Sequence, residues 1–573
     1  MHTFWADKHA DKAREHYRKT KRVGPIVISD WKTPSGRIHV GALRGVVLHD
    51  AVARSLRFSK SDVQYIYGFD DFDPFDKVPS YLNYETYSRY LGYPLVDVPA
   101  PTDGGLPGSS PTAQNNYAVY YSREFEEIYR KLGVDSVTYR SSSLYKEGWL
   151  NRAILIALRE AKKIRESYQN STKHFSKGRS VKASVDNDWF PLNIICNKCH
   201  RISTTYITDW KLDGEKAFVS YECRMGDNKV VSYVEGCGYI EKDISPYDGA
   251  AKLAWKVEWP AKWFILQTDL EGGGKDHYTK GGSREVANEI YKNVFVPEIK
   301  NELKNKEYPD KIEDLFYEWL YFGGKKMSTS KGVGVAAKEA YDFIPPELLR
   351  FLIVRTKPTT WVNFELSDEA VSSLFDEYDK VLREAVKDPL GSSAAVMKAA
   401  LIKNRELPEY VERFRTIVSL LQAELLRPRP TETVFQDLAI KVTERILKKA
   451  NRPLTLAEEE ELDRRIDYLK SRQIGDVKRK IEYATIIPEL TKEQISFLVI
   501  LKQEFVSLPV WTSEYIKEAI RRASQNSDIE PKVAFNSIYK LFLGQDSGPN
   551  VASYLAEYGK EATLLQLQKA SNA

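Results

Sequence analysis

Residues 25–51 read PIVISDWKTPSGRIHVGALRGVVLHDA and predict the fold around them. The run 25–29 has the length and β-branched content of a buried parallel strand. Turn-forming residues follow, and from Leu43 onward Val46, Val47 and Ala51 recur at helical spacing. The stretch therefore predicts a strand, a tight loop and a helix whose amino end can hold an anion, because unpaired N–H groups and the helix dipole point there. A triphosphate is the ligand that we expect.

The loop between this strand and helix, TPSGRIHVG at 33–41, has residues suited to a nucleotide. Gly36 and Gly41 allow a base or phosphate to approach the backbone, and His39 can donate a hydrogen bond to a phosphate oxygen. The alternative is an ordinary Pro-Ser-Gly turn before a helix, with His39 as a surface or capping residue.

A second stretch, GKKMSTSKG at 324–332, offers what transfer at ATP requires. Such transfer needs fixed positive charge and hydroxyl donors around the departing pyrophosphate. The lysines are Lys325, Lys326 and Lys331, and the hydroxyls are Ser328, Thr329 and Ser330. Flanking glycines would let the loop move as it closes. A solvated basic loop is the alternative, but a phosphate-binding helix start upstream favours the nucleotide.

Together the two stretches resemble the HIGH and KMSKS signatures of class I aminoacyl-tRNA synthetases. The chain most resembles the class I lysyl-tRNA synthetases, through stretches at 67–74, 77–79, 90–95, 252–263, 271–277 and 345–358. The resemblance implies activation of L-lysine with Mg²⁺-ATP and transfer to tRNA-Lys. It implies catalytic roles for His39, Lys326 and Lys331. It implies ATP binding by Pro34, Gly36, His39, Gly41, Met327, Ser328 and Ser330. In a doubly wound sheet, Asp276 in its glycine-rich stretch would be placed to accept hydrogen bonds from the ribose hydroxyls of ATP or from the substrate amine.

The resemblance also implies a lysine site, formed by Thr33, Trp255, His277 and Tyr317. Aromatic walls suit the four-carbon stem of lysine, although Trp and Tyr are most often core or interface residues.

At Thr329 many class I enzymes have a second lysine, but the lysyl enzymes often have a small residue there and a basic residue soon after, as Lys331 is here. The chain departs from the family at Ala42, where His or Asn is usual. It also departs at Gly45, which aligns with a family carboxylate facing the lysine ammonium. Asp71 and Asp73 are candidates to replace that carboxylate on chemistry alone.

The chain has only four cysteines, Cys196, Cys199, Cys223 and Cys237, all in one short window. A C-x-x-C pair with two later cysteines predicts one structural Zn²⁺ held by four thiolates. Disulfides are the alternative, but the polar, charged amino terminus shows no secretory signal. His200 could replace one sulfur. A second His- and Glu-containing cluster of the family has no counterpart at 114–120, so we expect one zinc.

At 573 residues, the chain is long enough for several domains. We expect an α/β fold, a doubly wound parallel-sheet (Rossmann-like) catalytic domain with a zinc-binding insertion, followed by an all-α helical bundle. Residues 1–190 and 246–365 would form the two halves of the catalytic domain, and residues 191–245 the insertion. Residues 366–573 would form an anticodon-binding helical region. The alternative for this last part is a helical scaffold with another use. Helical patterns at 437–449 and 456–472 support the last part.

The net charge of +5 neither requires nor excludes a nucleic-acid partner. No apolar run reaches the roughly twenty residues that a membrane span needs, so we expect a soluble, cytoplasmic protein. We also expect a monomer. Three other functions stay open: a class I synthetase of another specificity, such as glutamyl; a small-molecule ligase of the same superfamily; and a non-catalytic tRNA-binding paralogue. The first would change the amino acid, and the last would bind tRNA without activating any amino acid.

Overall fold

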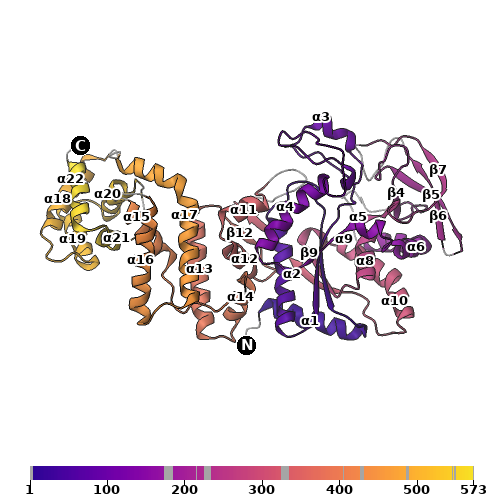
Figure 1. Ribbon diagram of the computed structural model, residues 1–573, viewed down its shortest axis with the longest axis horizontal. Coiled ribbons are helices and arrows are strands. Elements are labelled where there is room, and N and C mark those ends of the chain that lie inside the picture. The colour runs from indigo at the N-terminus through magenta and orange to yellow at the C-terminus, as the bar shows by residue number, and fades with distance from the viewer. Residues whose placement is uncertain are drawn as a thin grey trace. The chain divides into compact units, whose positions relative to one another are not determined.

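The computed structural model describes residues 4–172, 185–214, 216–224, 234–323, 334–403, 405–425, 431–485, 490–544, 546 and 550–571. The chain divides into two compact units (Figure 1). Unit 1 comprises Met1–Ala370 and Leu390–Asn404, and unit 2 comprises Val371–Pro389 and Arg405–Ala573.

Unit 1 is built on a five-stranded, fully parallel sheet of order β10-β9-β1-β2-β3. The strands are β1 (Ile26–Lys32), β2 (Val63–Phe69), β3 (Val137–Arg140), β9 (Leu270–Gly274) and β10 (Glu313–Tyr317). The chain runs from the central β1 outward to β3, then returns to the other side of β1 for β9 and β10. The direction therefore reverses between β1 and β9, which is the switch point of a doubly wound sheet. The predicted α/β fold class is confirmed.

Helix α2 (Gly41–Phe58) covers one face of this sheet and contacts β1, β2 and β9. Its apolar side chains Val46, Val47 and Ala51 are fully buried, as are those at the start of β1. Burial of each valine or isoleucine side chain stabilises the fold by roughly 1.5–3 kcal/mol. The predicted strand, loop and helix at residues 25–51 are thus confirmed as β1, its loop and α2.

The other face is covered by helix α8 (Trp255–Leu266), whose Leu266 packs against Val27 of β1 and Ile66 of β2. The remaining helices of unit 1 surround these layers (Figure 1). They are α1 (Trp5–Thr20), α3 (Tyr84–Tyr87), α4 (Tyr117–Lys131), α5 (Ser141–Lys146), α6 (Asn151–Arg159), α7 (Ala161–Thr172), α9 (Ser283–Ile290), the π-helix η4 (Tyr291–Phe295), α10 (Val296–Glu302), α11 (Ala337–Phe343), α12 (Pro346–Val354) and α14 (Ser392–Ala400), with short 3₁₀ turns at Ser88–Tyr90, Leu95–Asp97 and Lys275–His277.

Smaller sheets interrupt the doubly wound order. Between α7 and α8 lie the antiparallel pair β4 (Leu192–Ile194) and β8 (Ala251–Leu253), and a three-stranded antiparallel sheet of β5 (Thr205–Asp213), β6 (Lys216–Cys223) and β7 (Ile240–Ile244). A parallel pair, β11 (Leu320–Phe322) and β12 (Val362–Phe364), follows β10. No helix in the part of the chain that the structure describes is both long and apolar enough to span a membrane.

All the secondary-structure elements assigned in the described residues of unit 2 are helices. Its helices are α13 (Asp368–Lys387), which begins at the end of unit 1, α15 (Phe414–Leu425), α16 (Thr431–Ala450), α17 (Leu456–Thr485), α18 (Lys492–Val506), α19 (Ser513–Asn526), α20 (Pro531–Leu543), α21 (Val551–Tyr558) and α22 (Lys560–Ser571). The helical patterns predicted at 437–449 and 456–472 are confirmed within α16 and α17.

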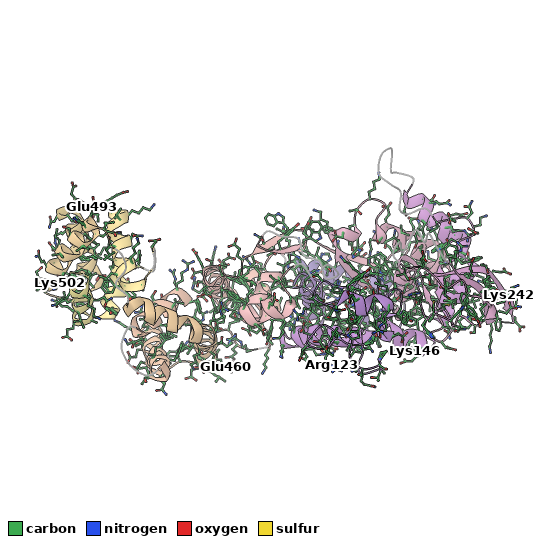
Figure 2. All side chains as sticks on the ribbon, turned by 90° about the horizontal axis from the view of Figure 1, so that it is seen from above. Arg123, Lys146, Lys242, Glu460, Glu493 and Lys502 are labelled. Atoms are coloured by element: carbon green, nitrogen blue, oxygen red, sulfur yellow. The ribbon has the colours of Figure 1, made fainter. Side chains whose placement is uncertain are left out.

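Charged side chains extend from both units (Figure 2). In unit 1 those labelled are Arg123 on α4, Lys146 on α5 and Lys242 on β7; in unit 2 they are Glu460 on α17 with Glu493 and Lys502 on α18.

Candidate functional site

A cavity of about 500 Å³, partly open to solvent, lies at the carboxyl ends of the parallel strands. It is lined by the ends of β1 and β9, by Tyr317 at the end of β10, by Asp70 just after β2 and by one face of α8. The cavity therefore includes the switch point between β1 and β9, where doubly wound sheets bind their ligands.

An aromatic wall closes one side of the cavity. Trp255 stacks on Trp259 with ring centroids 5.6 Å apart, and His277 lies 5.6 Å from the first ring and 5.3 Å from the second. Burial lowers the pKa of His277, which keeps the ring neutral near pH 7. The structure thus brings together three predicted lysine-site residues, Trp255, His277 and Tyr317, around one cavity.

Four carboxylates also line the cavity: Asp30, Asp70, Glu258 and Glu271. Lys262 Nζ pairs with Asp70 and, at 2.7 Å, with Glu258, and lies 3.9 Å from the centroid of the Trp31 ring. Glu271 accepts hydrogen bonds from the Ser29 hydroxyl and from two indole N–H groups, one of them Trp263 Nε1 at 3.0 Å. Three of the four carboxylates therefore have strong partners within the protein.

Sequence reasoning missed these four carboxylates and the other α8 residues of the cavity. Trp255, Glu258, Trp259 and Lys262 are spaced by three and four residues, so they share one helix face. That spacing is visible in the sequence and would have placed Glu258, Trp259 and Lys262 on the same helix face as the predicted site residue Trp255.

Thr33, the fourth predicted lysine-site residue, is not among the residues lining the cavity. Its hydroxyl donates to Asp73 Oδ2 at 2.7 Å, and Asp73 Oδ1 also pairs with Lys252 Nζ at 3.0 Å. Asp71 accepts hydrogen bonds from the backbone N–H and hydroxyl of Ser142, both at 2.8 Å. Neither Asp71 nor Asp73 lines the cavity. The two residues that the sequence suggested as partners of the lysine ammonium therefore bind other groups of the protein.

The predicted ATP-binding loop leads into the amino end of α2. Pro34, Gly36 and His39 precede the helix and Gly41 begins it. The Nδ1 atom of His39 is buried and has no hydrogen-bond partner among the described residues. Burial, with a smaller contribution from Lys32, lowers the pKa of His39 to about 3. The ring is therefore neutral at physiological pH and can donate one N–H to a ligand.

The second signature lies outside the described residues, and with it Lys325, Lys326, Met327, Ser328, Thr329, Ser330 and Lys331. Its carboxyl-terminal flank is described and pairs with the first signature. Val40 N donates to Val335 O at 3.0 Å, and Ala337 N donates to Ile38 O at 3.0 Å. His39 and Ala336 form an antiparallel bridge between these bonds. The residues that follow the second stretch, 335–337, therefore lie against the first stretch, across almost three hundred residues of sequence.

Asp276, also predicted to bind ATP, lies in the 3₁₀ turn Lys275–His277 after β9. Its Oδ2 accepts a hydrogen bond from Trp319 Nε1 at 3.1 Å. It adjoins His277 of the cavity wall, so it is beside the cavity rather than in its lining.

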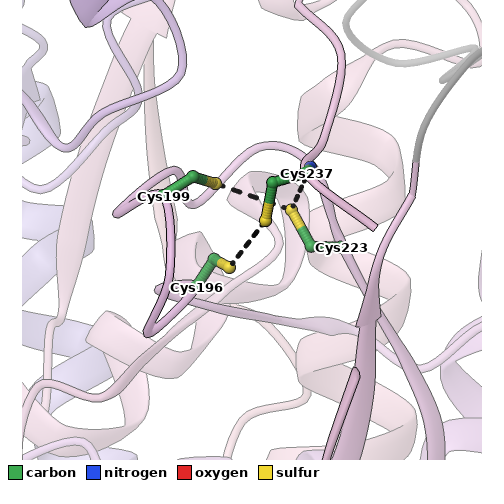
Figure 3. A group of neighbouring side chains, drawn as sticks. All are labelled: Cys196, Cys199, Cys223 and Cys237. Atoms are coloured by element: carbon green, nitrogen blue, oxygen red, sulfur yellow. Dashed lines mark hydrogen bonds between the residues drawn. The ribbon is translucent and has the colours of Figure 1, made fainter. Parts of the chain in front are cut away.

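The four cysteines converge within the insertion (Figure 3). Their sulfur atoms all lie within 4.8 Å of one another, with Cys196 to Cys237 at 3.7 Å and Cys199 to Cys223 at 3.6 Å. Thiolates around a tetrahedral Zn²⁺, with Zn–S of about 2.3 Å, stand about 3.8 Å apart. A disulfide would need about 2.05 Å, so the sulfurs are placed for a shared metal ion. His200 is not a member of this group.

The sheet and cavity define an α/β protein with its ligand site at the switch point. The family model for tRNA synthetases class I (K) matches residues 3–406. The chain belongs to this family, whose members are aminoacyl-tRNA ligases.

Curated relatives match over nearly the whole chain. The lysine--tRNA ligase of Methanococcus maripaludis is 29% identical over 580 residues, covering 96% of this chain and 98% of the relative. That of Picrophilus torridus is 30% identical over 552 residues, covering 93% and 94%. Among solved structures, a glutamate tRNA ligase from Elizabethkingia meningosepticum in complex with its amino acid is 14% identical, with a TM-score of 0.33, over 96% of this chain and 100% of that chain.

Proposed function

We propose that the protein is a lysine--tRNA ligase that activates L-lysine with ATP and transfers it to tRNA-Lys. The observation that supports the proposal is the pairing of residues 38–40 with residues 335–337, in the same unit as an aromatic and acidic cavity at the switch point of the sheet. The names of the relatives, which match over more than nine-tenths of the chain, supply the amino acid.

The proposed reaction needs no nucleophile from the protein. A carboxylate oxygen of lysine attacks the α-phosphorus of ATP, and pyrophosphate leaves with the electrons of the broken P–O bond. A ribose hydroxyl at the tRNA terminus then attacks the carbonyl carbon of the adenylate, and AMP leaves. Mg²⁺ carried by the ATP phosphates would offset part of their charge.

In this proposal the protein positions the reactants and stabilises charge. His39 and the amino end of α2 would hold ATP phosphates, with Pro34, Gly36 and Gly41 allowing close approach. Lys326 and Lys331 would stabilise the departing pyrophosphate, assisted by Met327, Ser328 and Ser330, and Asp276 would hold the ribose. Residues 366–573 would bind the anticodon region of the tRNA in the cytoplasm.

Amino-acid-dependent exchange of labelled pyrophosphate into ATP tests this function. With all twenty amino acids assayed separately, we expect only lysine to support exchange, followed by charging of purified tRNA-Lys. Exchange with glutamate instead would establish another class I specificity. Binding of tRNA without any exchange would identify a non-catalytic paralogue and refute the proposal.

For the cysteine cluster, we propose one structural Zn²⁺ bound by Cys196, Cys199, Cys223 and Cys237. All four ligands come from the protein, so the ion would leave no position for a catalytic water and would instead fasten the loop at Cys196 to strand β6.

Replacement of one ligand tests the zinc proposal. Cys223→Ser is expected to lower the bound zinc from one equivalent to nearly none, because a structural site needs its full ligand set. Zinc is measured by colorimetric release from the purified protein. His200→Ala is the matched control and should retain the full equivalent. Loss of zinc in the histidine variant alone would contradict the assignment.

A further inference from the structure

Gly45, in the second turn of α2, faces the carboxyl end of β1. A Cβ atom added to Gly45 would stand 2.6 Å from the Tyr317 hydroxyl oxygen and 2.9 Å from Oδ2 of Asp30. The hydroxyl and the carboxylate therefore use the space that a side chain at position 45 would take. Asp30 and Tyr317 also line the cavity, so this corner is one of its walls.

Asp30 differs from the other cavity carboxylates in its partners. The nearest basic nitrogen is His49 Nδ1, at 3.6 Å. His49 Nε2 accepts a hydrogen bond from Gly272 N at 2.9 Å, which leaves the proton on Nδ1, 2.8 Å from the carbonyl oxygen of Gly45. This tautomer is neutral, and burial lowers the pKa of His49 to about 4. His49 therefore supplies no positive charge to Asp30.

No lysine or arginine forms an ion pair with Asp30 in the described parts of the chain, and Lys32, on the same strand, acts on it only at longer range. The residue is 7% exposed. Burial, then the negative charge of Glu271, raises the pKa of Asp30 well above its ordinary value. A nearly buried carboxylate without a cation is costly unless a ligand supplies one.

We propose that Asp30 is the residue that receives the side-chain ammonium of lysine, with the Tyr317 hydroxyl beside it. This inference rests on the proposed function and makes Asp30 a determinant of its specificity. The rings of Trp255, Trp259 and His277 lie in the same cavity and can flank the methylene stem. A charge-assisted bond to a desolvated carboxylate distinguishes lysine from a neutral chain of equal length, because binding the neutral chain leaves the carboxylate unpaired.

The test is Asp30→Asn in lysine-dependent pyrophosphate exchange. We expect the KM for lysine to rise about 100-fold, because one partner of a buried charge pair is lost, while the KM for ATP changes little. Norleucine, which lacks the ammonium, serves as the neutral competitor. The variant should lose most of the preference for lysine over norleucine, a readout that general destabilisation would not change.

Asp71→Asn is the matched control, because Asp71 is also buried but is held by Ser141 and Ser142 outside the cavity. It should reduce stability and leave the preference for lysine intact. Gly45→Ala is the second variant. Its methyl group would displace Asp30 and Tyr317 without removing a charge, and we expect it to raise the KM for lysine about tenfold.

The outcomes separate the two proposals. If the wild-type protein does not activate lysine, the proposed function fails and the inference fails with it. If the wild type activates lysine and folded Asp30→Asn keeps its KM and its preference, only the inference is overturned. If Asp30→Asn does not fold, an unchanged lysine KM in Gly45→Ala overturns it.

Discussion

His39→Ala is expected to slow lysine-dependent pyrophosphate exchange by about 10²–10³-fold, because one preorganised donor to the reacting phosphates is lost. The Nδ1 atom of His39 is buried and has no hydrogen-bond partner among the described residues, and in the proposed function it would bind a phosphate oxygen of ATP. Single-turnover formation of the adenylate measures the effect. The binding of lysine should change much less than the rate, since this side chain is not part of the cavity lining.

Two further variants test whether the His39 side chain acts through a hydrogen bond. His39→Asn places an amide N–H near the former Nδ1 position and should recover part of the rate. His9→Asn is the control, because His9 Nδ1 is also buried without a partner in the described part of the chain but lies on α1, away from the cavity lining. Equal losses in His39→Asn and His39→Ala, or a similar loss in His9→Asn, would contradict a hydrogen-bonding role for His39.

The His39 side chain also leads to expectations for how the exchange rate and the folding stability depend on pH. With the pKa of His39 lowered to about 3 by burial, its ring does not titrate between pH 5 and 8. The free protein should therefore show no rate step from His39 near pH 6.5. A lowered histidine pKa makes folding stability change with pH in the opposite direction to the raised pKa of a salt-bridged histidine. The unfolded chain binds the proton more readily, so stability falls as the pH drops from about 6.5 towards 3.

The sequence predicted the β1 to α2 unit because its apolar spacing changes from strand to helix within one short stretch. It also predicted the cysteine cluster, since four thiols in one window have few uses. The sequence does not predict on which face of the sheet the Asp30 side chain lies. Every residue from Ile26 to Asp30 is buried, so β1 shows no alternation that would tell one face from the other. Only the packing of Gly45 against the strand end reveals which side chains fill that corner.

The buried ion pairs of Lys262 and Lys252 are a second feature that the sequence does not predict. Lysines are rarely fully buried unless paired, so residue type alone favours a solvated side chain at both positions. In the structure, Lys252 Nζ pairs with both Glu258 and Asp73, and Lys262 Nζ pairs with Glu258 and Asp70. These pairs join α8 to residues near the end of β2, a contact between segments almost two hundred residues apart that no local pattern encodes.

A buried ion pair fixes the helix that carries the first signature. Asp50 on α2 and Arg350 on α12 are both fully buried and paired, and Arg54 Nε lies 2.8 Å from Asp50 Oδ2. Arg350 Nη1 also donates to Leu132 O at 3.2 Å. Although burial raises the pKa of Asp50, the two guanidinium groups outweigh it and hold this pKa below its ordinary value. Its stabilisation is therefore present above about pH 3.8 and is lost as the pH falls further.

Asp50→Asn is expected to lower the free energy of unfolding of unit 1 by about 3–5 kcal/mol, because it leaves the Arg350 guanidinium buried without a counter-charge. Urea unfolding followed by tryptophan fluorescence measures this loss, since only Trp511 of the eleven tryptophans lies outside unit 1. Asp11→Asn, which breaks an exposed pair with Arg14 on α1, should cost at most about 1 kcal/mol.

A double variant then separates the ion pair from simple loss of packing. Asp50→Leu with Arg350→Met removes both charges together, so no uncompensated charge stays buried, and we expect it to recover most of the stability lost in Asp50→Asn. If the double variant is as unstable as the single one, the lost hydrogen bonds to backbone carbonyls, rather than the orphaned charge, account for the damage. Equal stability of Asp50→Asn and wild type would show that the pair does not hold α2 against α12.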